Sequence, residues 1–156
     1  MSYVDLHVHS NASDGTLSPE QVVRLAHEAG LSAIALTDHD TTAGVAGAAE
    51  AGAELGLEVV PGIEVSSSFR DHEIHILGLF VDTDSPSLQA ALKEFRHHRD
   101  QRNQEMLGRF DAHGIHLTAE DLCAGNPDTV ITRAHVARAL LAKGLGPDLD
   151  HIFKKY

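Results

Sequence analysis

The chain has 156 residues, of which 23 are acidic and 12 are Lys or Arg, so its formal net charge at neutral pH is −11. This length suits one compact unit with a hydrophobic core, with or without a helical attachment, and excludes two full domains. The acidic balance argues against broad electrostatic binding of nucleic acid or of an anionic membrane surface. A single cysteine, Cys123, excludes an internal disulfide, and the sequence shows no signal peptide and no apolar run of about 18 residues. We therefore expect a cytoplasmic protein with no membrane partner.

The first element is predicted from residues 4–9, where apolar and polar residues alternate. This period of two is typical of a half-buried strand, and it places His7 and His9 on the same face. Asp14 follows in the turn just beyond. Two imidazoles and a carboxylate form a donor set that suits zinc, manganese or iron. The stretch therefore predicts part of a metal site.

Helices and strands then alternate. Ser18 and Gln21, with Pro19 between them, form a capping box that predicts a helix start. We expect helices over about 19–29 and 42–55, and strands over 33–36, 57–65 and 73–80, with the 57–65 strand broken or bulged at Pro61-Gly62. This order predicts an α/β fold with a parallel sheet, in which a short turn joins the last two strands.

Polar residues collect at the ends of the predicted strands. In parallel α/β sheets the carboxyl ends of the strands share one edge, so these side chains are expected to converge there. His75 reaches the same edge if its strand runs antiparallel to its neighbour. The candidate metal ligands are His7, His9, Asp14, His39, Glu64 and His75. Glu64 suits a bridge between two ions, and Asp38 suits a hydrogen bond that orients a ligating imidazole.

From Ser85 onward only helices are predicted. They cover about 86–112, a short segment from Thr118 to Gly125, residues 133–143 behind the N-cap Thr132, and a last segment from about Asp148. We interpret residues 1–82 as the α/β part, 83–150 as an all-helical insertion subdomain, and 151–156 as a return toward the α/β part.

The helical region also contains candidate substrate contacts. The helix that Thr132 caps presents free N–H groups and Arg133, which together favour a phosphate, although an ordinary capped surface helix has the same pattern. Arg99, Arg102 and Asn103 share one helical face. They indicate either a second anion contact or a solvated charged face.

Four motifs make the sequence resemble the PHP (polymerase and histidinol phosphatase) family. They are His7-Val8-His9 with Ser13-Asp14-Gly15, Thr37-Asp38-His39, Gly62-Ile63-Glu64, and His75 to Leu79. The helical insertion looks like that of stand-alone members that act on nucleotides, namely 3′,5′-nucleotide bisphosphate phosphatases and 5′-to-3′ exoribonucleases. The resemblance implies a distorted (β/α)7 barrel with two to three divalent ions, of Mn, Zn, Fe or Mg, held by the six ligands named above.

The resemblance also implies that Arg133 and His135 meet the substrate phosphate. The predicted function is hydrolysis of nucleotide phosphate esters by metal-activated hydroxide, acting on the 3′-phosphate of nucleoside 3′,5′-bisphosphates or on the 5′ ends of short RNA. His39 or His135 could serve as general acid. The alternatives are a histidinol-phosphatase-like phosphomonoesterase and a non-catalytic metal-binding module.

The family's later motifs, an A-H-P histidine and a D-x-H pair, are not found before Tyr156. Four strands do not close a barrel. We therefore expect an N-terminal fragment whose missing C-terminal half completes the barrel. A partner chain that completes the site, or a genuine short form, are the alternatives.

Overall fold

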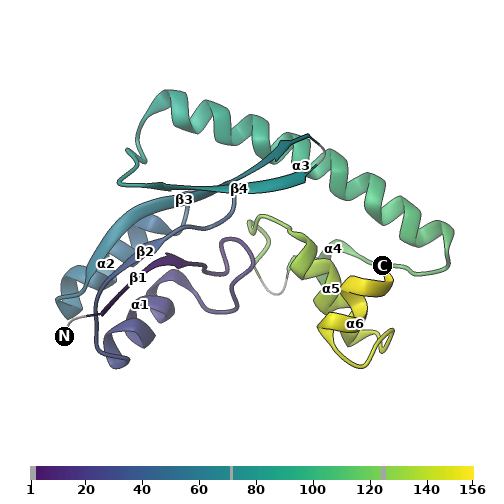
Figure 1. Ribbon diagram of the computed structural model, residues 1–156, viewed down its shortest axis with the longest axis horizontal. Coiled ribbons are helices and arrows are strands. Elements are labelled where there is room, and N and C mark those ends of the chain that lie inside the picture. Colours follow the sequence, from purple (N-terminus) through teal and green to yellow (C-terminus); the bar gives the residue numbers. More distant parts are fainter. Residues whose placement is uncertain (1–2, 71, 124–125) are drawn as a thin grey trace.

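A computed structural model of the chain describes residues 3–70, 72–123 and 126–156. An α/β unit precedes the long helix α3, and a cluster of short helices follows it (Figure 1). The elements of these residues are β1 (Tyr3–Val8), α1 (Pro19–Glu28), β2 (Leu31–Leu36), α2 (Val45–Leu55), β3 (Glu58–Phe69), β4 (His72–Leu79), α3 (Pro86–Ala112), α4 (Ala119–Cys123), α5 (Arg133–Ala142) and α6 (Leu149–Lys155). The predicted α/β class with a helical insertion is confirmed, while the predicted helix end at Gly125 lies outside the described residues.

The four strands form one sheet in the order β1-β2-β3-β4. β1, β2 and β3 are parallel, and β4 runs antiparallel to β3. Two crossover helices, α1 and α2, connect the parallel strands, as the alternating pattern predicted. The antiparallel β4 satisfies the condition under which His75 reaches the edge that the other candidate ligands occupy.

The predicted break in the third strand is wrong, because β3 continues through Pro61 and Gly62 as far as Phe69. β2 pairs with β3 up to Pro61, and β4 pairs with it from Gly62 onward. Proline cannot donate a backbone hydrogen bond, so the point where a strand changes partners tolerates it. The residues beyond the predicted end of this strand, Ser66 to Phe69, are mostly polar, and they belong to the strand because they pair with β4.

The prediction of a half-buried first strand is also wrong. Tyr3, Val4 and Leu6 of β1 are 66%, 55% and 41% exposed. β1 lies at the edge of the sheet, where β2 is the one strand of the described residues that pairs with it. Alternating polarity therefore identified a strand, but the burial of that strand depends on what packs against it.

The core of the α/β unit lies between the sheet and its two helices. Val23, Ile34, Leu36 and Ala48 are fully buried there. The capping box at the start of α1 forms as predicted. α2 begins at Val45 instead of Thr42, since the Thr41 side chain accepts a hydrogen bond from the Ala43 N–H and holds the preceding residues in a turn.

The helical cluster has a separate core. Leu122, Val136, Leu140 and Ile152 are buried in it, so α6 packs against α5. Among the described residues no helix has the length and apolar character needed to cross a bilayer.

The loop before α5 is joined to the loop after β1. Val130 N–H donates to the Ala12 carbonyl at 2.9 Å, and the Thr129 hydroxyl donates to the Ser13 carbonyl at 2.8 Å. These bonds bring the N-terminus of α5 beside Asp14.

Candidate metal centre and phosphate pocket

Six side chains from the strands β1, β3 and β4 and from the loops after β1 and β2 converge at one site, as the sequence predicted. Their donor atoms form three overlapping groups in which all atoms lie within 4.8 Å of one another. The groups are His7, His9 and Glu64; His9, Asp14 and His39; and His39, Glu64 and His75. All six residues that were predicted as ligands therefore lie close enough together to share metal ions, and their role as ligands stays a prediction.

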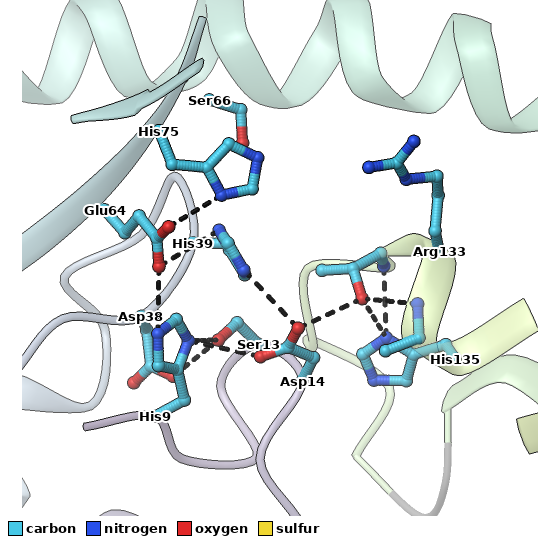
Figure 2. Close-up of polar contacts among 12 residues, drawn as sticks. His9, Ser13, Asp14, Asp38, His39, Glu64, Ser66, His75, Arg133 and His135 are labelled. Atoms are coloured by element: carbon cyan, nitrogen blue, oxygen red, sulfur yellow. Dashed lines mark hydrogen bonds and ion pairs between the residues drawn. The ribbon is translucent and has the colours of Figure 1, made fainter. Parts of the chain in front are cut away.

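Glu64 lies between His9 and His75 in this cluster (Figure 2). Its Oε2 lies 2.9 Å from both His7 Nε2 and His9 Nε2, and its Oε1 lies 2.6 Å from His75 Nδ1. The backbone of Glu64 is fixed as well, because its N–H donates to the Asp38 carbonyl at 3.1 Å and its carbonyl accepts from the Asp40 N–H at 3.0 Å. Sheet pairing therefore holds this carboxylate in place.

Asp14 and His39 form the other side of the cluster. Asp14 Oδ1 lies 3.1 Å from His9 Nδ1, and Asp14 Oδ2 lies 3.4 Å from His39 Nε2. The second nitrogen of His39, Nδ1, faces Glu64 Oε2 at 3.7 Å and has no hydrogen-bond partner among the described residues. One imidazole is thus directed at two carboxylates.

The arrangement fits divalent metal ions. Ligands about 2.1 Å from one ion lie roughly 3 Å apart, which matches the separations between nitrogen and oxygen in this cluster. A buried imidazole nitrogen without a partner is costly, and coordination to an ion would satisfy it. Four imidazoles and two carboxylates are the mixed donor set that transition metals such as zinc and manganese accept.

The electrostatics of the cluster favour charged carboxylates. Burial raises the pKa of Asp14, but hydrogen bonds and charge from His39 and His9 outweigh burial and hold that pKa well below its usual range. Burial likewise raises the pKa of Glu64, and His7, His39 and His75 lower it more. Burial lowers the pKa of His9, but Asp14 and Glu64 raise it above its ordinary value. The carboxylates are therefore ionised and ready to bind a cation.

Asp38 has a different set of partners from the one predicted. Its carboxylate accepts hydrogen bonds from the Ser10 N–H at 2.8 Å and from the hydroxyls of Ser10 and Ser13 at 2.6 Å. The predicted hydrogen bond to a ligating imidazole is absent among the described residues. Ser13 Oγ in turn lies 3.4 Å from His9 Nδ1, so Asp38 reaches the cluster through the loop that it holds. The sequence reading missed Ser10 and Ser13, although Ser13 belongs to the Ser-Asp-Gly motif.

Arg99 is buried and engaged with the protein itself. Its guanidinium donates to Asp40, to the Ser66 hydroxyl and to the Ile131 carbonyl. Asn103 is also buried and donates to the Ile131 carbonyl at 3.1 Å. These contacts join α3 to the segments that carry the candidate site and rule out a solvated face for these two residues. Arg99 also lines a pocket together with Asp14 and His39, and the anion contact predicted for Arg99 and Asn103 stays a prediction. Asp40 follows the Thr-Asp-His motif directly, and the sequence analysis did not single it out. Its φ of 51° is positive, a conformation that aspartate adopts more often than most residues do.

A pocket of about 170 Å³ lies between the ligand cluster and the helical region. The candidate ligands Asp14, His39 and His75 line it, and so do three arginines, Arg99, Arg102 and Arg133. Glu73 lies at the boundary, 3.2 Å from His75 Nε2 and 2.5 Å from the Arg133 guanidinium. The pocket therefore brings guanidinium groups and candidate metal ligands to one cavity.

Two further features of this pocket favour an anion. Desolvation and the charge of Arg99 lower the pKa of the Arg102 guanidinium, and a bound anion would offset both effects. The α5 N-terminus lines the same pocket through Thr132, Arg133 and Ala134. Thr132 is the N-cap of that helix, as predicted, and its hydroxyl accepts a hydrogen bond from the Ala134 N–H.

His135 is buried in the first turn of α5. Its Nδ1 accepts a hydrogen bond from the Thr132 N–H at 3.1 Å, so the neutral ring carries its proton on Nε2. Burial and the charge of Arg138 lower the pKa of His135. The imidazole therefore completes the helix cap.

Comparison with known proteins decides the family. The model of the PHP domain matches residues 5–154. The chain belongs to the PHP family. It is 40% identical over 158 residues to the 3′,5′-nucleoside bisphosphate phosphatase of Chromobacterium violaceum, and 40% identical over 157 residues to the 5′-3′ exoribonuclease Rnm of Escherichia coli. These alignments cover 100% and 97% of the chain but 55% and 53% of the relatives, so the chain spans about half the length of these PHP proteins.

Solved structures of similar proteins agree with the fold. An amidohydrolase from Chromobacterium violaceum, solved with bound sulfate, superimposes with a TM-score of 0.90 at 40% identity, over 98% of the chain and 54% of that structure. A candidate metal-dependent phosphoesterase from Bifidobacterium adolescentis has a TM-score of 0.89 at 32% identity, over 99% of the chain and 55% of that structure. The expectation that this is a PHP fold with a helical insertion is confirmed.

Proposed function

We propose that the protein is a metal-dependent phosphoesterase that acts on nucleotides. The observation that carries the proposal is the pocket that Asp14, His39 and His75 line together with Arg102 and Arg133. Ion ligands and guanidinium groups in one cavity suit a phosphate ester, because metal ions and guanidinium groups together neutralise its charge. The named activities of the relatives, on nucleoside bisphosphates and RNA, support a nucleotide as the substrate.

The six donor side chains are proposed to hold two to three divalent ions of Mn, Zn, Fe or Mg. When bound, such ions polarise the phosphate ester and activate water for attack on phosphorus. Glu64 lies close to three imidazoles and suits a bridging position, and Asp38 holds the loop that carries His9 and Asp14 through its bonds to Ser10 and Ser13.

The helical side is proposed to bind the phosphate. Arg133 is 61% exposed at its side chain, and Arg102 is exposed too, so both can turn toward a ligand. The backbone of the first turn of α5 adds the positive end of a helix dipole. His135 is proposed to position this turn, since its ring is already used as the cap. The single cysteine supports the proposed cytoplasmic location.

The test is phosphate release by the chain in the presence of Mn²⁺, with adenosine 3′,5′-bisphosphate and a short 5′-phosphorylated RNA as substrates. We expect turnover that EDTA abolishes and that added Mn²⁺ restores. His9→Gln should remove the activity, whereas His98→Gln, an exposed histidine on α3, should leave it unchanged. Equal activity of the His9→Gln and wild-type proteins, or activity insensitive to EDTA, would overturn the proposal.

A further inference from the structure

The loop that carries Asp14 is hydrogen-bonded along its length by the chain around the start of α5. We call residues 10–14 the Asp14 loop and residues 126–142 the α5 segment. Four consecutive carbonyls of the loop accept hydrogen bonds from the segment, which lies beside it (Figure 1). The carbonyls are those of Asn11, Ala12, Ser13 and Asp14, and their donors are in turn the Asn126 side-chain amide at 2.8 Å, the Val130 N–H at 2.9 Å, the Thr129 hydroxyl at 2.8 Å and the Arg138 guanidinium. The α5 segment therefore binds the backbone of the whole loop after Ser10.

The donor groups of the same loop are bound on its other side, within the α/β unit. The Asp38 carboxylate accepts hydrogen bonds from the Ser10 N–H and from the hydroxyls of Ser10 and Ser13. The Asn11 N–H donates to the Leu17 carbonyl at 2.8 Å. Ser10 and Ser13 are fully buried, and a buried carbonyl that loses its partner is costly, so the loop would shift to regain one. The conformation of the loop therefore depends on the α5 segment as well as on the α/β unit.

Asp14 is held in place by this loop, whereas His39 and Glu64 pair with each other in a parallel bridge at the end of the sheet. The Asp14 carboxylate lies 3.1 Å from His9 Nδ1 and 3.4 Å from His39 Nε2. The Thr132 hydroxyl of the α5 segment donates to the same carboxylate at 3.5 Å. Metal ligands must be held to within about 0.5 Å of their binding geometry. A shift of the loop would therefore move Asp14 out of the ligand cluster.

We propose that Thr129 and Arg138 are positioning residues that hold Asp14 in the geometry in which it binds a metal ion. Both act through backbone carbonyls, those of Ser13 and Asp14. The helical part of the chain thus contributes to metal affinity in addition to the phosphate contacts proposed above. The proposal rests on the metal centre of the proposed phosphoesterase function. Because the coupling between two sites is reciprocal, a bound ion also strengthens the contact between the α5 segment and the Asp14 loop.

The first test is calorimetric titration of the chain and its variants with Mn²⁺. Thr129→Val replaces the hydroxyl by a methyl group of similar size, so the Ser13 carbonyl loses its donor while the packing is kept. We expect the affinity for Mn²⁺ to fall by about tenfold, the lower end of the losses that follow when the partners of metal ligands are removed. Arg138→Met should lower the affinity by a similar factor. Thr129→Ser retains the hydroxyl and should bind Mn²⁺ as the wild type does.

A control variant separates positioning from stability. Val136→Ala removes methyl groups from the core of the helical cluster, and its side chain cannot donate to the loop. It should lower the free energy of unfolding, measured with urea, and leave the affinity for Mn²⁺ unchanged. The proposal would be overturned if Val136→Ala or Thr129→Ser weakened Mn²⁺ binding as much as Thr129→Val, because affinity would then follow stability or side-chain size and not the lost donor.

A second measurement uses the wild-type protein alone. The N–H of Val130 donates to the Ala12 carbonyl, so its hydrogen exchange reports on the contact between the α5 segment and the Asp14 loop. Saturating Mn²⁺ should slow this exchange by about tenfold, the same factor by which loss of the contact weakens Mn²⁺ binding. This measurement decides the question if circular dichroism shows that Thr129→Val and Arg138→Met do not fold. Exchange that Mn²⁺ leaves unchanged would then overturn the proposal.

The titrations also distinguish a failure of this proposal from a failure of the proposed function. If the wild type does not bind Mn²⁺, the metal-dependent function fails, and the positioning role of Thr129 and Arg138 fails with it. If the wild type binds Mn²⁺ and the folded variants Thr129→Val and Arg138→Met bind it equally well, the positioning role alone is overturned and the proposed function stands.

Discussion

The pocket that the candidate metal ligands share with Arg102 and Arg133 is built differently on its α/β side and on its helical side. On the α/β side, Glu64 and His39 are buried, and strand pairing and the serine-bound Asp38 fix the backbone that carries them. On the helical side, Arg102 and Arg133 are exposed at the ends of long side chains. Metal ligands must keep short distances to one ion, which needs a rigid support, whereas a phosphate can be met by cations that adjust. Arg99 differs from Arg102 and Arg133 although it is the same residue type, because it is buried and links α3 to Asp40 and Ser66.

The largest effect is expected where the two sides are joined. Arg99→Met would leave the buried carboxylate of Asp40 without its cation, at a cost of about 3–5 kcal/mol in the free energy of unfolding. Urea denaturation measures this. Arg133→Met is the matched control, because its exposed pair with Glu73 should contribute about 1 kcal/mol or less. Similar losses in the free energy of unfolding for Arg99→Met and Arg133→Met would contradict the distinction between the buried Arg99 and the exposed Arg133.

The next effect concerns the metal ligands. Glu64→Gln replaces a carboxylate that approaches three imidazoles, and it should weaken Mn²⁺ binding by about 100-fold or more. Mutation of residues that only hydrogen-bond to metal ligands already weakens metal binding by about 10- to 100-fold, and the loss of a ligand should cost at least as much. Calorimetric titration with Mn²⁺ measures the change, and Glu54→Gln on the exposed face of α2 controls for lost charge. Unchanged affinity in Glu64→Gln would remove this residue from the proposed ligand set.

The smallest effect is a pH dependence on the helical side. Burial lowers the pKa of His135, so the folded state binds its proton less readily than the unfolded chain, whose pKa is about 6.5. The free energy of unfolding should therefore fall as the pH drops below about 6.5, since protonation of Nδ1 also removes the acceptor for the Thr132 N–H.

This pH dependence is measured as the difference between wild type and His135→Gln at pH 7.5 and 5.5. Gln suits the same capping-box position and does not titrate. A stability loss of equal size in both proteins would show that His135 does not cause it.

Local sequence determined the helix starts, the order of strands and the identity of the candidate ligands. Ser18 and Thr132 cap their helices because the capping pattern is satisfied by neighbours in the chain. His7, His9, His39 and Glu64 converge because parallel strands with right-handed crossovers share one edge, and this rule needs no knowledge of packing.

Tertiary structure alone decided the features that depend on distant partners. The continuation of β3 through Pro61 depends on pairing with β4, and the exposure of β1 depends on its edge position. Arg99 and Arg102 are three residues apart on one helix and both line the pocket, yet contact with Asp40 and Ser66 makes only the first a buried link. The periodicity of a helical sequence predicts which side of the helix a residue occupies. It does not predict which charged residue of another segment packs against that side.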